Sequence, residues 1–345
     1  MQIKLVKSLR GGETLAEPVI TEEKEILIKK GTVLKLEYLD LISFLGIDTV
    51  CIEDPYLSYE HPHPLMQIEK LKSYIEKVKK ILEKHIYSEK TELKSINTLA
   101  NDLIKELENI DENIVIDMKE RSGNLYEHTI MVTLLSLIVA KRLKLEESQI
   151  KDLVIGALLH DLGLRYITVP YTNCEIEKSS LSEATEFKKH PVLAFAALEN
   201  EEWVSYNSKK LVLSHHERRD GSGFPLKRKS KEMEYNILQA CDAFDCMISG
   251  MECKRVSVQS ALEYLVETAD ILFEKSVVKI LEKIIARYPV GTKVRLNTGE
   301  DGIVVSQTQD SIHPIVSVLD KDEKICDIQY NLDKCRKVTI LQVMD

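Results

Sequence analysis

Residues 215–225 read HHERRDGSGFP, and this stretch decides both the fold and the site that the sequence predicts. Neighbouring positions of a helix point about 100° apart, so His215 and His216 cannot both face one apolar core. They can converge on metal ions, and the next residue, Glu217, is acidic. The glycines and the proline that follow indicate a loop. This pattern is poorly suited to a core and well suited to a site.

Two other segments carry groups of the same kind. Upstream, ALLHDLG ends a predicted helix with His160 and Asp161 just before a glycine stop. Downstream, CDAFD places the carboxylates of Asp242 and Asp245 three positions apart on one face of a predicted helix. Neutral imidazole together with carboxylate suits divalent iron, manganese or zinc. The sequence therefore predicts a metal site built from these segments.

Composition narrows the class of protein. The chain has 345 residues, of which 44% are apolar, enough for two to three domains with a buried core. A formal charge of −9 argues against a partner that is a nucleic acid polymer, because such partners need a basic face. Seven cysteines without a CxxC pair argue against disulfides and against a cysteine-zinc site.

The sequence gives no sign of a membrane partner. The longest apolar run, Ile130 to Ala140, has eleven residues, well short of a span. The amino terminus, MQIKLVKSLRGGE, lacks the apolar core of a signal peptide. We therefore expect a cytoplasmic protein.

Hydrophobic patterning divides the chain into four parts and predicts a mainly α fold with small β-rich domains at both ends. Residues 1–60 alternate short apolar runs with glycines and predict a small β-rich domain. Residues 61–115 predict a helical linker, and residues 116–287 a helical metal-binding domain. From residue 288 to 345 the period changes to two, which predicts a small β-barrel-like domain.

The predicted linker has two interpretations. Its amphipathic pattern, rich in Lys and Glu, is typical of a solvated helix or helical hairpin that joins domains. The same apolar stripe also suits a dimerisation helix, so a homodimer stays open as an alternative.

The motifs together resemble one known family. The loop follows the pattern HHExxDGxG[YF]P, and it combines with His160-Asp161, His190 and Asp242 in a similar order and spacing. This combination resembles the HD-GYP family, a branch of the HD phosphohydrolases, over residues from about 118 to 287. The resemblance implies an HD-type helical bundle that binds two or three metal ions, usually iron or manganese. It also implies hydrolysis of cyclic di-GMP to pGpG or GMP.

The resemblance carries the family's metal ligands onto seven positions of this chain. They are His128, His160, Asp161, His190, His215, His216 and Asp242. It implies that Asp161 bridges two metals and is central to catalysis, where a hydroxide between the cations attacks phosphorus. Some relatives add a carboxylate four residues before the first histidine, and this chain has Asn124 there. We therefore predict two divalent ions, iron or manganese.

The substrate side departs from the family pattern. The family's lysine, tyrosine and arginine are replaced by Leu164, Phe224 and Met251. The residues assigned to substrate binding are Arg165, Arg219, Phe224 and Lys254. Two acids are assigned supporting roles: Asp220 orders the loop, and Asp245 orients a histidine ligand from the second shell.

Three functions fit these motifs. The first is a metal-dependent phosphodiesterase, a hydrolase acting on a cyclic dinucleotide, with cyclic di-GMP as the substrate that the resemblance implies. The second is a catalytically weak or inactive metal-binding module that senses a cyclic dinucleotide, which the three substitutions favour. The third is hydrolysis of another phosphoester.

Overall fold

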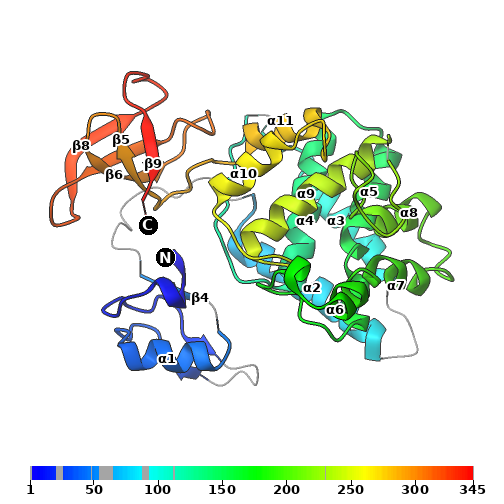
Figure 1. Ribbon diagram of the computed structural model, residues 1–345. Helices are drawn as coiled ribbons and strands as arrows, with labels where there is room; N and C mark the ends of the chain where they lie inside the picture. Colours follow the sequence, from blue (N-terminus) through cyan, green and yellow to red (C-terminus); the bar gives the residue numbers. More distant parts are fainter. Residues whose placement is uncertain are drawn as a thin grey trace. The chain divides into compact units, whose positions relative to one another are not determined.

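The structure is a computed structural model that describes residues 2–20, 26–47, 49–53, 65–87, 93–111, 113–229 and 231–344. Contacts divide the chain into two compact units. One comprises Met1–Pro62, Asp117–Ser122 and Tyr288–Asp345, and the other comprises His63–Ile116 and Gly123–Arg287. The fold is mainly α with small antiparallel sheets near both ends, which confirms the predicted fold class (Figure 1).

The second unit is helical. Its elements are α2 (Ile68–Tyr87), α3 (Ser95–Glu106), α4 (Leu125–Arg142), α5 (Glu147–Leu159), η2 (Leu162–Tyr166), η3 (Ile176–Lys178), α6 (Leu181–Phe187), α7 (His190–Ala197), α8 (Tyr206–Ser214), α9 (Met233–Ser249), α10 (Val258–Glu267) and α11 (Lys275–Ile284). Among the described residues, no helix combines the length and the apolar character needed to span a bilayer.

The core of this unit is α4, which packs against α5 and α9. Almost every residue of α4 is buried, because a helix that is apolar on all sides must be enclosed by others. The helix begins at Leu125. Asn124 caps it, accepting hydrogen bonds from the backbone N–H groups of Tyr126 and Glu127, both at 3.1 Å.

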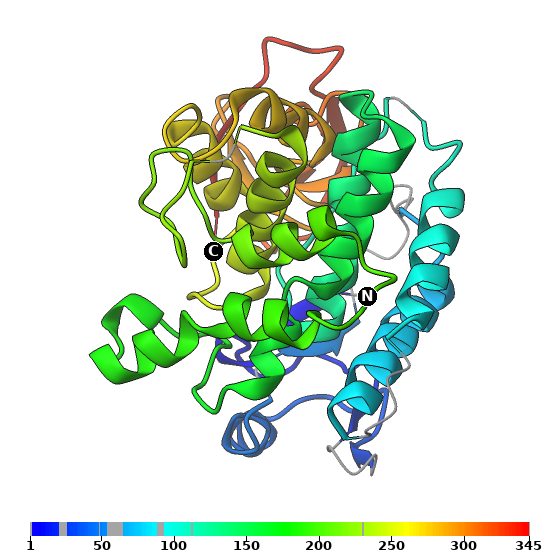
Figure 2. The same ribbon diagram turned by 90° about the vertical axis from the view of Figure 1, so that its right-hand side faces the viewer.

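The segment that was predicted to be a linker packs into the helical unit. Helix α2 lies against α4, and α3 lies against α5 (Figure 2). Their apolar stripes are covered there, since Val78 and Leu82 of α2 and Leu99 and Leu103 of α3 are buried. An amphipathic helix needs a partner for its apolar face, and here the partner is the same chain. The predicted boundary at residues 60 and 61 lies outside the described residues.

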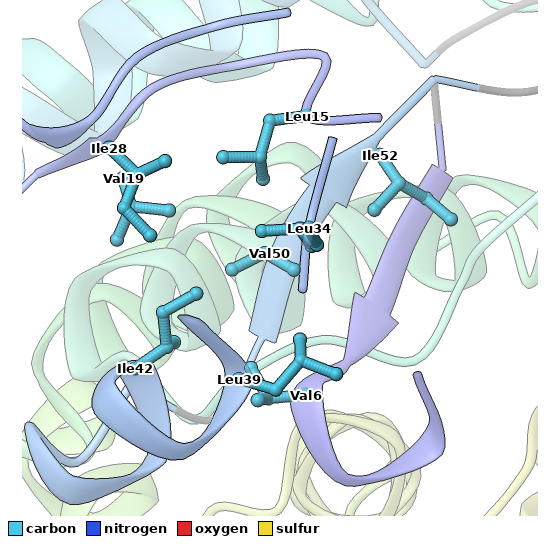
Figure 3. Packing of buried hydrophobic residues seen from close by; sticks show 9 residues of the cluster. All are labelled: Val6, Leu15, Val19, Ile28, Leu34, Leu39, Ile42, Val50 and Ile52. Atoms are coloured by element: carbon cyan, nitrogen blue, oxygen red, sulfur yellow. The ribbon is translucent and has the colours of Figure 1, made fainter. Parts of the chain in front are cut away.

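The described residues of the amino-terminal module form four short strands, one 3-10 helix and one α-helix. Its elements are β1 (Gln2–Leu5), η1 (Val6–Ser8), β2 (Val19–Ile20), β3 (Ile26–Ile28), α1 (Leu36–Phe44) and β4 (Thr49–Ile52). Antiparallel pairing joins β1 to β4 and β2 to β3. Leu15, Leu34 and Ile42 lie at the centre of its apolar cluster (Figure 3).

The carboxy-terminal module is a five-stranded antiparallel sheet in the order β8-β7-β6-β5-β9. Its strands are β5 (Lys293–Leu296), β6 (Asp301–Ser306), β7 (Ile315–Leu319), β8 (Ile325–Asn331) and β9 (Ile340–Val343). Strand β8 lies at an edge of the sheet, and its side chains are half-buried or exposed. Within the described residues β8 and β9 form the two edges, so the sheet is open rather than closed like a barrel.

Removing a core side chain of α5 is expected to destabilise the helical unit. Leu158 is fully buried, and Leu158→Ala should lower the free energy of unfolding by about 2–5 kcal/mol through lost burial and the cavity left behind. Urea denaturation followed by circular dichroism measures this change. Leu181→Ala is the control, because its side chain is 86% exposed and its effect should stay below about 0.5 kcal/mol. Equal effects of the two substitutions would contradict the packing described.

Candidate metal centre

The structure brings the seven predicted ligands into one buried cluster with two adjoining groups of donor atoms. The first group consists of Nε2 of His128, Nε2 of His160, Oδ2 of Asp161 and Oδ1 of Asp242, separated by 3.2 to 3.6 Å. The second group consists of Oδ1 of Asp161 and Nε2 of His190, His215 and His216, with measured separations of 3.1 to 3.6 Å. Asp161 therefore faces both groups, one oxygen to each.

Separate helices supply these donors. His128 lies on α4, and Asp242 lies on α9. His160 directly follows α5, His190 begins α7, and the adjacent pair of histidines directly follows α8. The cluster thus depends on how five helices of the unit meet.

Backbone carbonyl groups fix the orientation of three of the rings. Nδ1 of His160 lies 2.7 Å from the carbonyl oxygen of Ala157, and Nδ1 of His215 lies 2.7 Å from that of Val212. Nδ1 of His190 lies 2.9 Å from the carbonyl oxygen of Phe187. Because a carbonyl only accepts hydrogen bonds, Nδ1 must carry the hydrogen. In the neutral ring, Nε2 then presents a lone pair to the cluster.

The carboxylate of Asp245 fixes the orientation of a fourth ring, that of His128. Oδ2 of Asp245 lies 2.7 Å from Nδ1 of His128, and both side chains are fully buried. A carboxylate behind a histidine ligand orients the ring and increases the basicity of its other nitrogen.

The two groups have different electrostatics. Burial lowers the pKa of His128, but hydrogen bonds to Asp242 and Asp245 outweigh it and raise the pKa to about 9. In the second group burial is the largest cause and lowers the pKa of His190, His215 and His216, that of His216 to about 4. The second group therefore holds neutral rings at neutral pH.

Several buried oxygens in the cluster lack a hydrogen-bond partner among the described residues. They are both carboxylate oxygens of Asp161, Oδ2 of Asp242 and Oε1 of Glu252. An unsatisfied buried carboxylate oxygen is costly, and lone pairs of imidazoles about 3 Å apart repel each other. A divalent cation in each group would accept electron pairs from these oxygens and from the imidazole nitrogens, which removes both costs. The donor set therefore fits divalent metal ions.

The loop after the paired histidines folds back onto His216. Glu217 is buried and accepts hydrogen bonds from the backbone N–H groups of residues 226, 227 and 228, at 2.6 to 3.0 Å. Its carboxylate thus holds the loop and does not face the metal donors. Asp220 accepts from the backbone N–H of Ser222 at 2.8 Å, which orders the turn. Phe224 stacks on the ring of His216, with centroids 4.5 Å apart.

The residues assigned to substrate binding do not gather in one place. Phe224 lines an open pocket of about 620 Å³ together with Lys188, Lys189 and Lys227, three cations that the sequence analysis did not single out. Arg219 is paired with Glu274.

The other two assigned cations have different surroundings. Arg165 hydrogen-bonds to Tyr171, and Lys254 is exposed on the loop after α9. Leu164 and Met251 are buried, so their side chains belong to the core.

The sequence analysis missed Glu252 and Cys246, which both reach the cluster. Oε2 of Glu252 lies 3.2 Å from Nε2 of His216, and Sγ of Cys246 lies 3.5 Å from Oδ1 of Asp242. Burial raises the pKa of Cys246 well above its ordinary value, so it is present as the thiol. Its spacing of four residues after Asp242 on α9 is the one signal that could have predicted it.

Comparison with known proteins agrees with this geometry. The family model of the HD domain matches residues 109–277. A cyclic di-GMP phosphodiesterase of Pseudomonas aeruginosa is 27% identical over 196 residues, which cover 56% of this chain and 47% of that protein. The cyclic di-GMP phosphodiesterase response regulator RpfG of Xanthomonas campestris pv. campestris is 30% identical over 149 residues, covering 42% of this chain and 39% of that protein. The chain thus spans less than half the length of these two relatives.

A solved structure has a related description. It is an HDG"Y"P protein from Bdellovibrio bacteriovorus, 16% identical, with a TM-score of 0.45 over 81% of this chain and 97% of that chain.

Helices that enclose histidine and aspartate donors in two adjoining groups define an HD domain that could bind divalent metal ions. Over residues 109–277 the chain is similar to the HD domain, and Phe224 stands where the HD-GYP motif that its sequence resembles has the tyrosine.

A methyl group on Gly163 is expected to disrupt the second group of donors. A Cβ atom there would overlap the backbone carbonyl of His190, so α7 would have to move away from η2. Gly163→Ala should lower the stability of the helical unit by about 3 kcal/mol and weaken Mn²⁺ binding, as measured by thermal unfolding and calorimetric titration. Gly299→Ala is the control: its left-handed backbone, with φ of 86°, makes this substitution costly as well, but nothing lies within 4 Å of the added carbon and the residue lies in the other unit, so metal binding should be unchanged. Normal metal binding by Gly163→Ala would show that this close approach is not needed.

Proposed function

We propose that the protein is a metal-dependent phosphodiesterase that hydrolyses a cyclic dinucleotide, with cyclic di-GMP as the first candidate. The observation that carries the proposal is the shared carboxylate of Asp161, which presents one oxygen to each group of buried donors. Asp161 could therefore help to hold a cation in each group, and such cations would supply positive charge to a bound phosphate. The relatives named as cyclic di-GMP phosphodiesterases support the substrate.

The donor types support iron or manganese in both positions. Imidazole and carboxylate together suit these metals, and these two kinds of group make up both sets of donors. Bound divalent cations would polarise the phosphate oxygens and lower the pKa of a bound water molecule, so that hydroxide would be available at neutral pH. The protein's own part is to hold the donors: carbonyl groups fix three rings, and Asp245 fixes the ring of His128.

The pocket beside Phe224 supports a ligand larger than one phosphate. Its volume of about 620 Å³ lies in the range of small-molecule sites, and its three lysines suit a second phosphate. Lys188 lies over the ring of Phe224, with Nζ 5.8 Å from the centroid. Phe224 also stacks on His216, so one ring joins the pocket to the metal donors. Such a ring offers a face on which a base can stack.

A second candidate is a sensor that binds the cyclic dinucleotide with little or no turnover. The observation that favours it is the burial of Leu164 and Met251, at positions where the family resemblance implies cations. Without those cations, transition-state charge would be stabilised by the metals and the pocket lysines alone. Both candidate functions require that the protein bind the cyclic dinucleotide, but only the phosphodiesterase hydrolyses it at an appreciable rate.

Loss of the shared carboxylate is expected to abolish both metal binding and turnover. Asp161→Asn keeps the shape of the side chain but removes the charge that both groups use. Metal content after anaerobic purification should fall from about two ions per chain to less than one. Release of pGpG or GMP from cyclic di-GMP should fall at least about a hundredfold, as measured by chromatography.

The matched control for this variant is Asp152→Asn on α5. Asp152 lies outside the cluster and accepts a hydrogen bond from Ser205 at 2.6 Å, so metal content and turnover should be retained. Wild-type protein that holds metal but releases no product would favour the sensor. Wild-type protein without metal would contradict both candidates.

Removal of a pocket lysine is expected to weaken substrate binding. Lys188→Ala should raise KM for cyclic di-GMP about fivefold with little change in kcat, because an exposed charge contributes about 1 kcal/mol to phosphate binding. Lys210→Ala is the matched control, since Lys210 also lies over an aromatic ring, that of Tyr206, but outside the pocket. A fall in kcat with an unchanged KM would contradict the role of Lys188 in substrate binding.

A further inference from the structure

Glu252 enters the cluster from the loop that follows α9. The helix ends at Gly250, in a left-handed conformation with φ of 69°, and Met251 then pairs with Thr172 in an isolated bridge. The backbone N–H of Glu252 donates to the carbonyl oxygen of Tyr171 at 2.5 Å. Two contacts with one neighbouring segment thus fix where the side chain of Glu252 begins.

The backbone of Glu252 is itself left-handed, with φ of 61°. Residues other than glycine adopt this conformation at an energetic cost, and such residues gather at functional sites. The glutamate side chain that this backbone carries ends among the second group of donors. A strained backbone at a position whose side chain reaches the donor cluster points to a functional role for that side chain.

The carboxylate of Glu252 faces two of the three rings in that group. Oε2 lies 3.2 Å from Nε2 of His216, and Oε1 lies 3.8 Å from Nε2 of His190. These separations resemble those among the other donors of the group. The side chain is only 10% exposed, and Oε1 has no hydrogen-bond partner among the described residues.

The charges of the two groups explain why a carboxylate is useful here. The first group has two carboxylates, those of Asp161 and Asp242. The second group has three neutral imidazoles and shares only Asp161, so it offers a divalent cation less negative charge. In the absence of a cation, Glu252 is buried near two other carboxylates, and this burial and repulsion raise its pKa well above the ordinary value.

We propose that Glu252 is a further metal ligand, which gives the second group a carboxylate of its own and binds the cation held by His190, His215 and His216. The inference rests on the proposed metal centre but not on any substrate or turnover. It adds a donor outside the seven positions that the motifs supplied. A second carboxylate also shifts the preference of this group towards manganese or iron, since carboxylate ligands suit harder cations.

The test is Mn²⁺ binding to the full metal-free chain. Glu252→Gln keeps the size of the side chain and removes its charge, and Glu252→Gly removes the side chain while suiting the left-handed backbone. In both variants one of the two Mn²⁺ ions should bind at least about tenfold more weakly, as measured by calorimetric titration. The other ion should bind with unchanged affinity.

Thermal unfolding gives a second readout that a purely structural role would not produce. Without metal, Glu252→Gln should have a higher Tm than the wild type, because the wild type buries this carboxyl group beside two other acids and must either keep it charged or protonate it on folding. With Mn²⁺ in excess, the increase in Tm should be smaller than in the wild type. A structural role predicts a lower Tm in both conditions and an unchanged metal-induced increase, which would overturn the proposal.

Glu175→Gln is the matched control, because Glu175 is an exposed acid in the same unit, paired with Lys178. It should leave both Mn²⁺ affinities and both Tm values unchanged. If the wild type binds two ions and the Glu252 variants bind both equally well, the proposal fails while the phosphodiesterase remains supported. If the wild type binds no Mn²⁺, the proposed metal centre and the role of Glu252 fail together.

Discussion

The helical unit is constrained by one requirement, the burial of groups that repel one another. Nε2 atoms of neighbouring histidines approach to 3.1 Å, and both oxygens of Asp161 are buried with no hydrogen-bond donor among the described residues. A fold with no use for this arrangement would separate these groups or expose them to water. The crossing of α4, α5 and α9, and the close approach of η2 to α7, keep them together.

Helix ends perform two tasks in this arrangement. The last carbonyl groups of a helix have no partner within it and must be satisfied in another way. Ala157 of α5, Val212 of α8 and Phe187 of α6 have their carbonyl oxygens within hydrogen-bonding distance of a histidine Nδ1 three residues later. The contact that completes each helix end therefore also aims Nε2 into the cluster, so local chain geometry accounts for much of the orientation.

Local patterns predicted most of the helical elements and the position of the cluster, because adjacent histidines and a histidine-aspartate pair at a helix end are rare combinations. They could not predict Glu252, one acid among the 56 aspartates and glutamates of the chain, whose position depends on a loop conformation. Local patterns also could not predict the ion pair between Arg219 and Glu274, since these residues are 55 positions apart in the chain.

The donors are spread from His128 on α4 to Asp242 on α9, with Glu252 just beyond, and this spread determines when the site can form during biosynthesis. A growing chain has only the pairs at residues 160–161 and 215–216 as local fragments of the cluster. The complete set exists only after α9 has been synthesised and has packed against α4. The full set of proposed metal donors therefore becomes available only as the helical unit reaches its packed state.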